Sequence, residues 1–122
     1  MVSKGGSMGQ LTTHILDTAN GTPAAGVDIR LYALDSDRSQ CAATVTNGDG
    51  RTEHPLVAGE ALVTGTYELE FDIGDYFRSK GSASSEPAFL DTVVIRVSLN
   101  ADEHYHVPLL VSPWSYSTYR GS

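Results

Sequence analysis

Histidine side chains are the first candidates for chemistry in this sequence. His104 and His106 stand two residues apart in "HYHVPLL", so on a β-strand both point to the same face. With His14 or His54 as a third nitrogen ligand, they could hold a zinc ion that keeps one open coordination position. The same imidazoles could instead move protons, because the histidine pKa lies close to neutral pH. A histidine on a strand is also often purely structural, so the residues alone leave these alternatives open.

An arginine and the C-terminal tail are the other candidates. Arg51 follows the turn sequence "NGDG", in which glycines let the backbone reverse. The sequence closes on Tyr119-Arg120-Gly121-Ser122, a ring, a guanidinium, a flexible residue and a hydroxyl in succession. Such a tail is either a closing strand or part of a site. The sequence has neither the G-x-S-x-G turn of many serine hydrolases nor a phosphate-binding loop.

Charge and composition exclude several kinds of partner. The chain has 122 residues, enough for one domain, and its 8 basic and 15 acidic residues give a formal net charge of −7. Nucleic acid and anionic membranes both need a basic surface, so neither is expected as a partner. No apolar run approaches the ~20 residues of a membrane span. The single cysteine, Cys41, cannot form a disulfide within the chain, and its alternating surroundings predict a buried strand residue.

Hydrophobic residues recur with a period of two, which is typical of β-strands with one buried face. In "TYELEFDI", for example, Tyr67, Leu69 and Phe71 alternate with Glu68 and Glu70. The pattern predicts strands over residues 11–17, 27–34, 41–46, 66–73, 92–99, 104–111 and 115–120. Turn-forming sequences such as "NGTPAAG" and "NADE" separate them. Seven or eight short strands with one short helix predict an antiparallel β-sandwich.

The remaining segments are a helix, a loop and a leader. "DYFRSKG" predicts a short helix that Asp75 caps and Gly81 stops, followed by a polar loop over residues 82–88. Residues 1–9 lack the apolar core of a secretory signal, and we interpret them as a flexible leader or cloning remnant before a domain at residues 10–122. Without an export signal or a peroxisomal S-K-L ending, the expected location is cytoplasmic.

Three stretches in order resemble the transthyretin-like family: "LTTHILDTANGTPAAGV", "TNGDGRT" and "HYHVPLLVSPWSYSTYRGS". The resemblance covers residues 11–122, and the final YRGS is typical of the hydrolase branch of the family rather than of the hormone carrier. It implies a transthyretin-like sandwich, a homotetramer built as a dimer of dimers, and sites in a channel where the dimers meet. The implied activity is hydrolysis of 5-hydroxyisourate in urate degradation. A carrier of small molecules without catalysis is the alternative.

The resemblance also implies which residues form the site. The expected catalytic residues are His14, Arg51, His106 and Ser122, and the expected substrate-binding residues are His14, Arg51 and Tyr119. No metal or other cofactor is expected. Arg51 would stabilise the negative charge that builds on the carbonyl oxygen, while one of the histidines deprotonates a water molecule. Which histidine is the base stays open, and Ser122 would hold the water or the developing oxyanion.

Three residues near the C-terminus carry structural predictions. Pro108 has no N–H to donate, so the strand over 104–111 is expected at a sheet edge or at a bulge, close to an interface. Gly121 is expected to adopt backbone angles closed to other residues. Arg120 is expected to pair with an acidic residue across an interface or to contact substrate.

Overall fold

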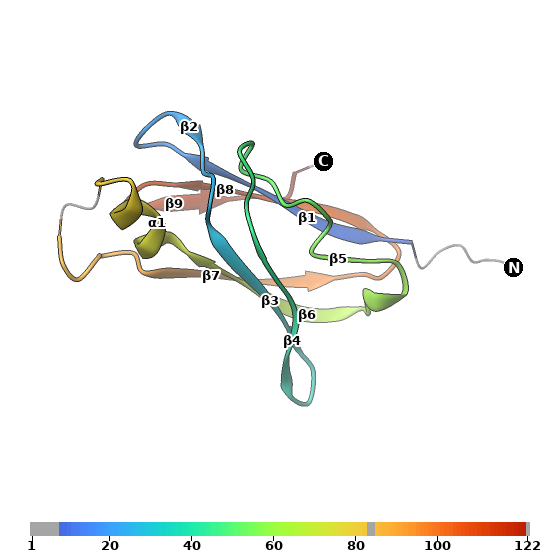
Figure 1. The fold of residues 1–122 in the computed structure, drawn as a ribbon. Coiled ribbons are helices and arrows are strands. Elements are labelled where there is room, and N and C mark those ends of the chain that lie inside the picture. Colours follow the sequence, from blue (N-terminus) through green and yellow to red (C-terminus); the bar gives the residue numbers. More distant parts are fainter. Residues whose placement is uncertain (1–7, 83–84, 122) are drawn as a thin grey trace, which may run out of the picture.

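Two β-sheets face each other in this computed structural model, which describes residues 8–82 and 85–121 (Figure 1). The strands are β1 (Gln10–Asp17), β2 (Thr22–Pro23), β3 (Asp28–Leu34), β4 (Arg38–Val45), β5 (Val57–Ala58), β6 (Gly65–Asp72), β7 (Thr92–Leu99), β8 (His104–Val111) and β9 (Tyr116–Thr118). The helical elements are the 3-10 turn η2 (Gly59–Ala61) and the helix α1 (Ile73–Ser79). One sheet has the order β2-β1-β8-β9, with β5 also paired to β1, and the other has the order β4-β3-β6-β7. The predicted β-sandwich with one short helix is confirmed.

The core lies between the two sheets and is built from the predicted alternation. In β1, Leu11, Thr13 and Ile15 are buried, while the residues between them are half-buried on the other face. The stripes predicted over 27–34, 66–73, 92–99 and 104–111 also supply the core; fully buried examples are Ile29, Leu31, Leu69, Phe71, Val93 and Leu109. Because every second residue of β1 and β8 is used by the core, the residues between them lie on the outer face of the first sheet.

The neighbours β1 and β8 run parallel, whereas the other paired strands are antiparallel. Their register extends from Gln10 beside His104 to Asp17 beside Val111. An entirely antiparallel sandwich was therefore an incomplete prediction, because the alternation gives the face of each residue but not the direction of the neighbouring strand.

Pro108 lies in a central strand, so its predicted place at an edge or a bulge is wrong. Strand β8 pairs with β1 on one side and with β9 on the other. The carbonyl oxygen of Pro108 accepts a hydrogen bond of 2.7 Å from Thr118 Oγ1, so this residue faces β9. There the regular ladder stops at Thr118 and resumes only as an isolated bridge between His106 and Gly121. The break in the ladder falls where proline has no donor to offer.

Helix α1 begins at Ile73, with Asp72 as its N-cap, so the prediction of Asp75 as the cap is wrong. The backbone carbonyl of Asp91 accepts hydrogen bonds from the N–H groups of Ile73 and Gly74, at 3.0 and 2.8 Å. A side-chain cap is not needed where a neighbouring segment supplies the acceptor. Gly81, predicted as the stop, follows the helix with a φ of 69°.

Cys41 is exposed, and the prediction of a buried strand residue is wrong. It does lie in β4, but β4 is an edge strand of its sheet and has no buried residue. The pairing with β3 also shifts, since Leu31 lies beside Ala42 while Tyr32 lies beside Gln40. Cys41 is the extra residue of this bulge, which removes it from the alternation.

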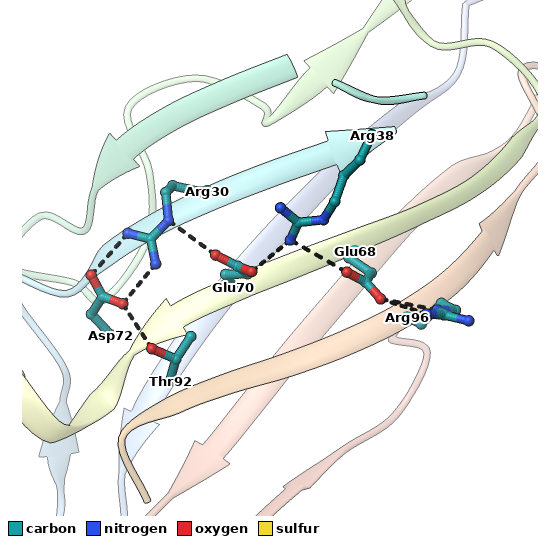
Figure 2. A network of polar contacts seen from close by, with 7 residues as sticks. All are labelled: Arg30, Arg38, Glu68, Glu70, Asp72, Thr92 and Arg96. Carbon is teal, nitrogen blue, oxygen red and sulfur yellow. Dashed lines mark hydrogen bonds and ion pairs between the residues drawn. The ribbon is translucent and has the colours of Figure 1, made fainter. Parts of the chain in front are cut away.

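The outer face of the second sheet is covered by ion pairs, as Figure 2 shows. The network comprises Arg30, Arg38, Glu68, Glu70, Asp72, Thr92 and Arg96. Arg30 forms a bidentate pair with Asp72 at 2.8 Å and also contacts Glu70, its register neighbour, at 3.1 Å. Every charge drawn in Figure 2 has an opposite partner, so these side chains tie β3, β4, β6 and β7 together.

The N-terminal boundary stays a prediction, because most of the expected leader, residues 1–7, lies outside the described residues. Gly9, its last residue, is buried, and its N–H donates to the carbonyl of Ala101 at 3.1 Å. In the part of the chain that the structure describes, no helix is long and apolar enough to span a membrane.

Candidate active site

The parallel pairing of β1 and β8 brings two of the predicted histidines together on the outer face of the first sheet. Thr12 lies beside His106 in the register, and His14 lies beside Pro108, one step of the alternation further along. The rings of His14 and His106 have centroids 6.5 Å apart and are tilted by 35°. Both side chains are half-buried, so each combines a fixed position with access from outside.

Arg51 joins this group through the turn that precedes it. The side-chain oxygen of Asn47 accepts hydrogen bonds from the N–H groups of Asp49 and Arg51, at 2.9 and 3.2 Å. The carbonyl of Gly50 accepts from the Ile15 N–H at 2.8 Å, and Arg51 forms a bridge with His14. Within the described ranges its guanidinium has no carboxylate partner, so it is available to a ligand on this face.

Gly50 makes that docking possible for two reasons. Its φ of +75° is a conformation that side chains rarely adopt, and a Cβ atom there would lie 2.4 Å from the carbonyl oxygen of Ile15. Any larger residue would therefore push the turn away from β1 and carry Arg51 with it. The glycine at position 50 is thus required for the contact with β1 as well as for the turn itself.

The tail reaches the same group beyond β9. The N–H of Gly121 donates to the carbonyl of His106 at 2.7 Å, which holds the chain end over β8. Gly121 does not have a positive φ, so the predicted reason for a glycine there is wrong. The actual reason is contact, because a Cβ atom at this position would lie 2.9 Å from Cδ2 of His106. Tyr119 is 60% exposed, and Ser122 lies outside the described residues.

Arg120 pairs with an acidic residue of its own chain rather than across an interface. Its Nη2 lies 3.0 Å from Glu103 Oε1 and donates to the carbonyl of His104 at 3.1 Å. The guanidinium also lies over the ring of Tyr105, with Cζ 4.2 Å from the ring centroid. These contacts anchor the tail to the start of β8. Sequence reasoning missed Glu103 because a contact across 17 positions leaves no local pattern.

The electrostatic surroundings favour a neutral His106. Burial lowers the pKa of this imidazole below its ordinary value of 6.5, and the nearby Arg51 and His14 lower it further. At neutral pH the ring is therefore free to accept a proton. A hollow of about 180 Å³ is lined by Thr12, Arg51 and His54. Thr12 contacts His106, and Arg51 pairs with His14, so the hollow is linked to both histidines through its lining residues.

The arrangement suggested for zinc does not form within one chain. His104 and His54 are both exposed, and His54 lines the hollow beside Arg51. Among residues 8–82 and 85–121, no three histidine, cysteine or carboxylate side chains lie close enough together to hold a metal ion. The group that does form, two imidazoles and a guanidinium, suits proton transfer and the binding of negative charge.

Comparison with known proteins places this arrangement in a family. Residues 11–121 match the HIUase/Transthyretin family. A protein of Ralstonia nicotianae named 5-hydroxyisourate hydrolase is 57% identical over 117 residues, which are 94% of this chain and all of the relative. The solved structure of Klebsiella pneumoniae 5-hydroxyisourate hydrolase is similar with a TM-score of 0.79 at 34% identity, over 93% of this chain and 94% of that one. The crystal structure of (S)-allantoin synthase has a TM-score of 0.90 at 49% identity and matches 94% of this chain, which spans 44% of the other. The chain belongs to the HIUase/Transthyretin family.

Proposed function

We propose that this protein hydrolyses 5-hydroxyisourate to 2-oxo-4-hydroxy-4-carboxy-5-ureidoimidazoline, a step of urate degradation. The observation that carries the proposal is the meeting of His14, Arg51 and His106 on one sheet face, with the tail held over His106. The names of the relatives support the same substrate.

In the proposed mechanism a water molecule attacks a ring amide carbonyl of the substrate. The C–N bond of that amide then breaks and opens the ring, and the leaving nitrogen takes up the proton that came from the water. His106 accepts the proton of that water, since its lowered pKa keeps it neutral at physiological pH. His14 orients the water from the other side, across a ring separation of 6.5 Å that one bridging molecule can span. Arg51 stabilises the negative charge that develops on the carbonyl oxygen.

The tail completes the proposed site. Tyr119 offers an exposed aromatic ring and a hydroxyl, which suit the flat, polar heterocycle. The terminal Ser122 supplies a hydroxyl for the water or the oxyanion. Deleting residues 119–122 should leave a folded protein, because Tyr119 and Arg120 are exposed and add no buried side chain to the core, but should nearly abolish turnover.

We also propose that the protein assembles as a homotetramer, a dimer of dimers, in the cytoplasm. Strand β9 is one edge of the first sheet and β7 is one edge of the second, and edge strands are commonly covered. An apolar hollow of about 350 Å³, lined by residues such as Ile95, Val97 and Tyr105, lies between β7, β8 and the tail. Light scattering combined with the activity assay tests the assembly, and a fully active monomer would refute it.

The decisive experiment is turnover of freshly generated 5-hydroxyisourate, followed through its absorbance decay beside the uncatalysed reaction. His14→Ala and His106→Ala should each lower the rate by ~10²–10⁴, as is typical of a positioned acid–base group. A carrier without catalysis would bind the substrate without accelerating its decay. A zinc hydrolase would lose activity to a chelator and regain it with zinc, whereas the proposed mechanism predicts no change.

A further inference from the structure

The hydroxyl of Thr12 contacts the His106 ring on the outer face of the first sheet. Thr12 Oγ1 lies 2.9 Å from Nδ1 of His106 and 3.4 Å from the carbonyl oxygen of Tyr105. The parallel register puts Thr12 directly beside His106, and both side chains are half-buried. The contact is therefore a fixed property of the β1–β8 pair.

The donors and acceptors around this hydroxyl allow two protonation patterns of the His106 ring. A threonine hydroxyl has a single hydrogen to donate, and a backbone carbonyl can only accept. If the hydroxyl donates to the Tyr105 carbonyl, it accepts from His106, whose Nδ1 must then carry the proton. If the hydroxyl donates to Nδ1 instead, it has no hydrogen left for the Tyr105 carbonyl. The unprotonated nitrogen of the ring is then Nδ1, which is already occupied by this hydrogen bond.

A histidine that works as a base must suit both its neutral and its protonated form. In the imidazolium both ring nitrogens are donors. A Thr12 hydroxyl that accepts from Nδ1 keeps its hydrogen bond when Nε2 takes up a proton. A hydroxyl that donates to Nδ1 would have to turn away at each proton transfer.

We propose that Thr12 is a positioning residue that holds His106 with its proton on Nδ1, so that Nε2 is the atom that accepts a proton. The catalytic meaning of this assignment rests on the proposed hydrolysis, whereas the tautomer belongs to the resting protein. Gly121 of the tail also helps to hold the His106 ring in this orientation. Gly121 approaches the Cδ2 edge so closely that a Cβ atom would lie 2.9 Å away, so Thr12 and the tail confine the ring from two sides.

The tautomer is measured directly by nitrogen-15 NMR of the imidazole rings, without substrate, at a pH above the His106 pKa. Loss of the corresponding signals in His106→Asn identifies the ring. We expect a protonated Nδ1 and an unprotonated Nε2 in the unaltered protein. A protonated Nε2 would overturn the proposal whatever the variants do.

Variants then test whether Thr12 is the cause. Thr12→Val, which removes the hydroxyl at nearly constant shape, should shift the ring towards the other tautomer and lower kcat about 10–100-fold with little change in KM, as for other groups that orient a reacting imidazole. Thr12→Ser should restore both. The matched control is Thr13→Val: the Thr13 hydroxyl donates to the carbonyl of Val107 at 2.7 Å on the buried face, so the tautomer should stay unchanged.

The two proposals fail in different ways. A Thr12→Val protein with the original tautomer and the original kcat would overturn the role of Thr12 and leave the hydrolysis intact. A protein with the expected tautomer that does not accelerate the decay of 5-hydroxyisourate would refute the hydrolysis and keep the tautomer assignment.

Discussion

The substitution Gly121→Ala tests whether the tail controls His106 by contact. The added Cβ would lie 2.9 Å from His106 Cδ2 and 3.3 Å from the His106 carbonyl oxygen, and an ordinary contact begins at 3.4 Å. The ring or the tail must therefore move by about 0.5 Å, the difference between 3.4 and 2.9 Å. A misplacement of ~1 Å costs about a hundredfold in rate, so half of that should cost about tenfold, or about 1.4 kcal/mol of activation free energy.

The same substitution should change stability very little. Weakening the Gly121–His106 hydrogen bond costs up to about 1 kcal/mol, and replacing glycine by alanine restores a similar amount by restricting the unfolded chain. The assay is kcat/KM for 5-hydroxyisourate beside the free energy of unfolding in urea. Gly65→Ala is the control, because a Cβ atom added at Gly65 would have no neighbour within 4 Å and the φ of this residue is not positive. Full activity of Gly121→Ala would refute the contact argument, and so would a loss of activity explained by unfolding.

Three further predictions concern charge. Burial acts to raise the Asp17 pKa, but hydrogen bonds from Asn20 and Tyr76 outweigh it and hold the pKa below its ordinary value of 3.8. The ionised Asp17 therefore stabilises the fold above pH 3.8, and this stabilisation is lost as the pH falls through the pKa of Asp17 in the folded protein. Tyr76→Phe should thus lower the free energy of unfolding by about 1.5–3 kcal/mol at pH 7 and by less at pH 3, as denaturant titrations at the two pH values would reveal. Burial and, after it, the Arg51 charge lower the His106 pKa, so the acid limb of the kcat/KM pH profile should lie below pH 6.5. This limb should move to higher pH in Arg51→Gln but not in Arg51→Lys, which keeps the positive charge. A limb that moves in neither variant would contradict the assignment of His106 as the base. Glu103→Gln should free Arg120 and lower turnover several-fold, yet change stability by less than about 1 kcal/mol, since the pair is exposed; unchanged kinetics would show that the anchor is dispensable.

The parts of the fold that follow a local rule could be predicted from the sequence. The period-two stripes gave β3, β6, β7 and β8 to within a residue or two, because one buried face imposes the same alternation on each. The bulge at Cys41 could not be predicted, since it depends on the register between two strands rather than on either strand alone. The parallel direction of β1 relative to β8 could not be predicted for the same reason.

The candidate site shows the same division between features that follow from local sequence and features that depend on contacts between distant residues. The motifs around His14, Arg51 and His106 named the residues, and the structure brings those three together. The contacts that hold them are non-local: Thr12 and His106 are 94 positions apart, and the turn carbonyl that docks Arg51 meets a backbone N–H of β1. For Gly121 the sequence suggested backbone freedom, whereas the reason is the distance to a ring that only the folded chain brings near.

The parallel β1–β8 pair also determines when the site can exist. Closing a loop of 94 residues costs about 4 kcal/mol of chain entropy, and parallel pairing between distant segments is slow to form. The strand pairs of the second sheet close shorter loops and so lose less chain entropy. Strands β3 and β4 are consecutive in sequence, and only α1 lies between β6 and β7. We therefore expect the second sheet to fold early, while β1 waits with an unpaired edge until β8 has been synthesised. During translation the first strand is thus an aggregation hazard, and a nascent chain acquires its His14–His106 pair only when its last strands leave the ribosome.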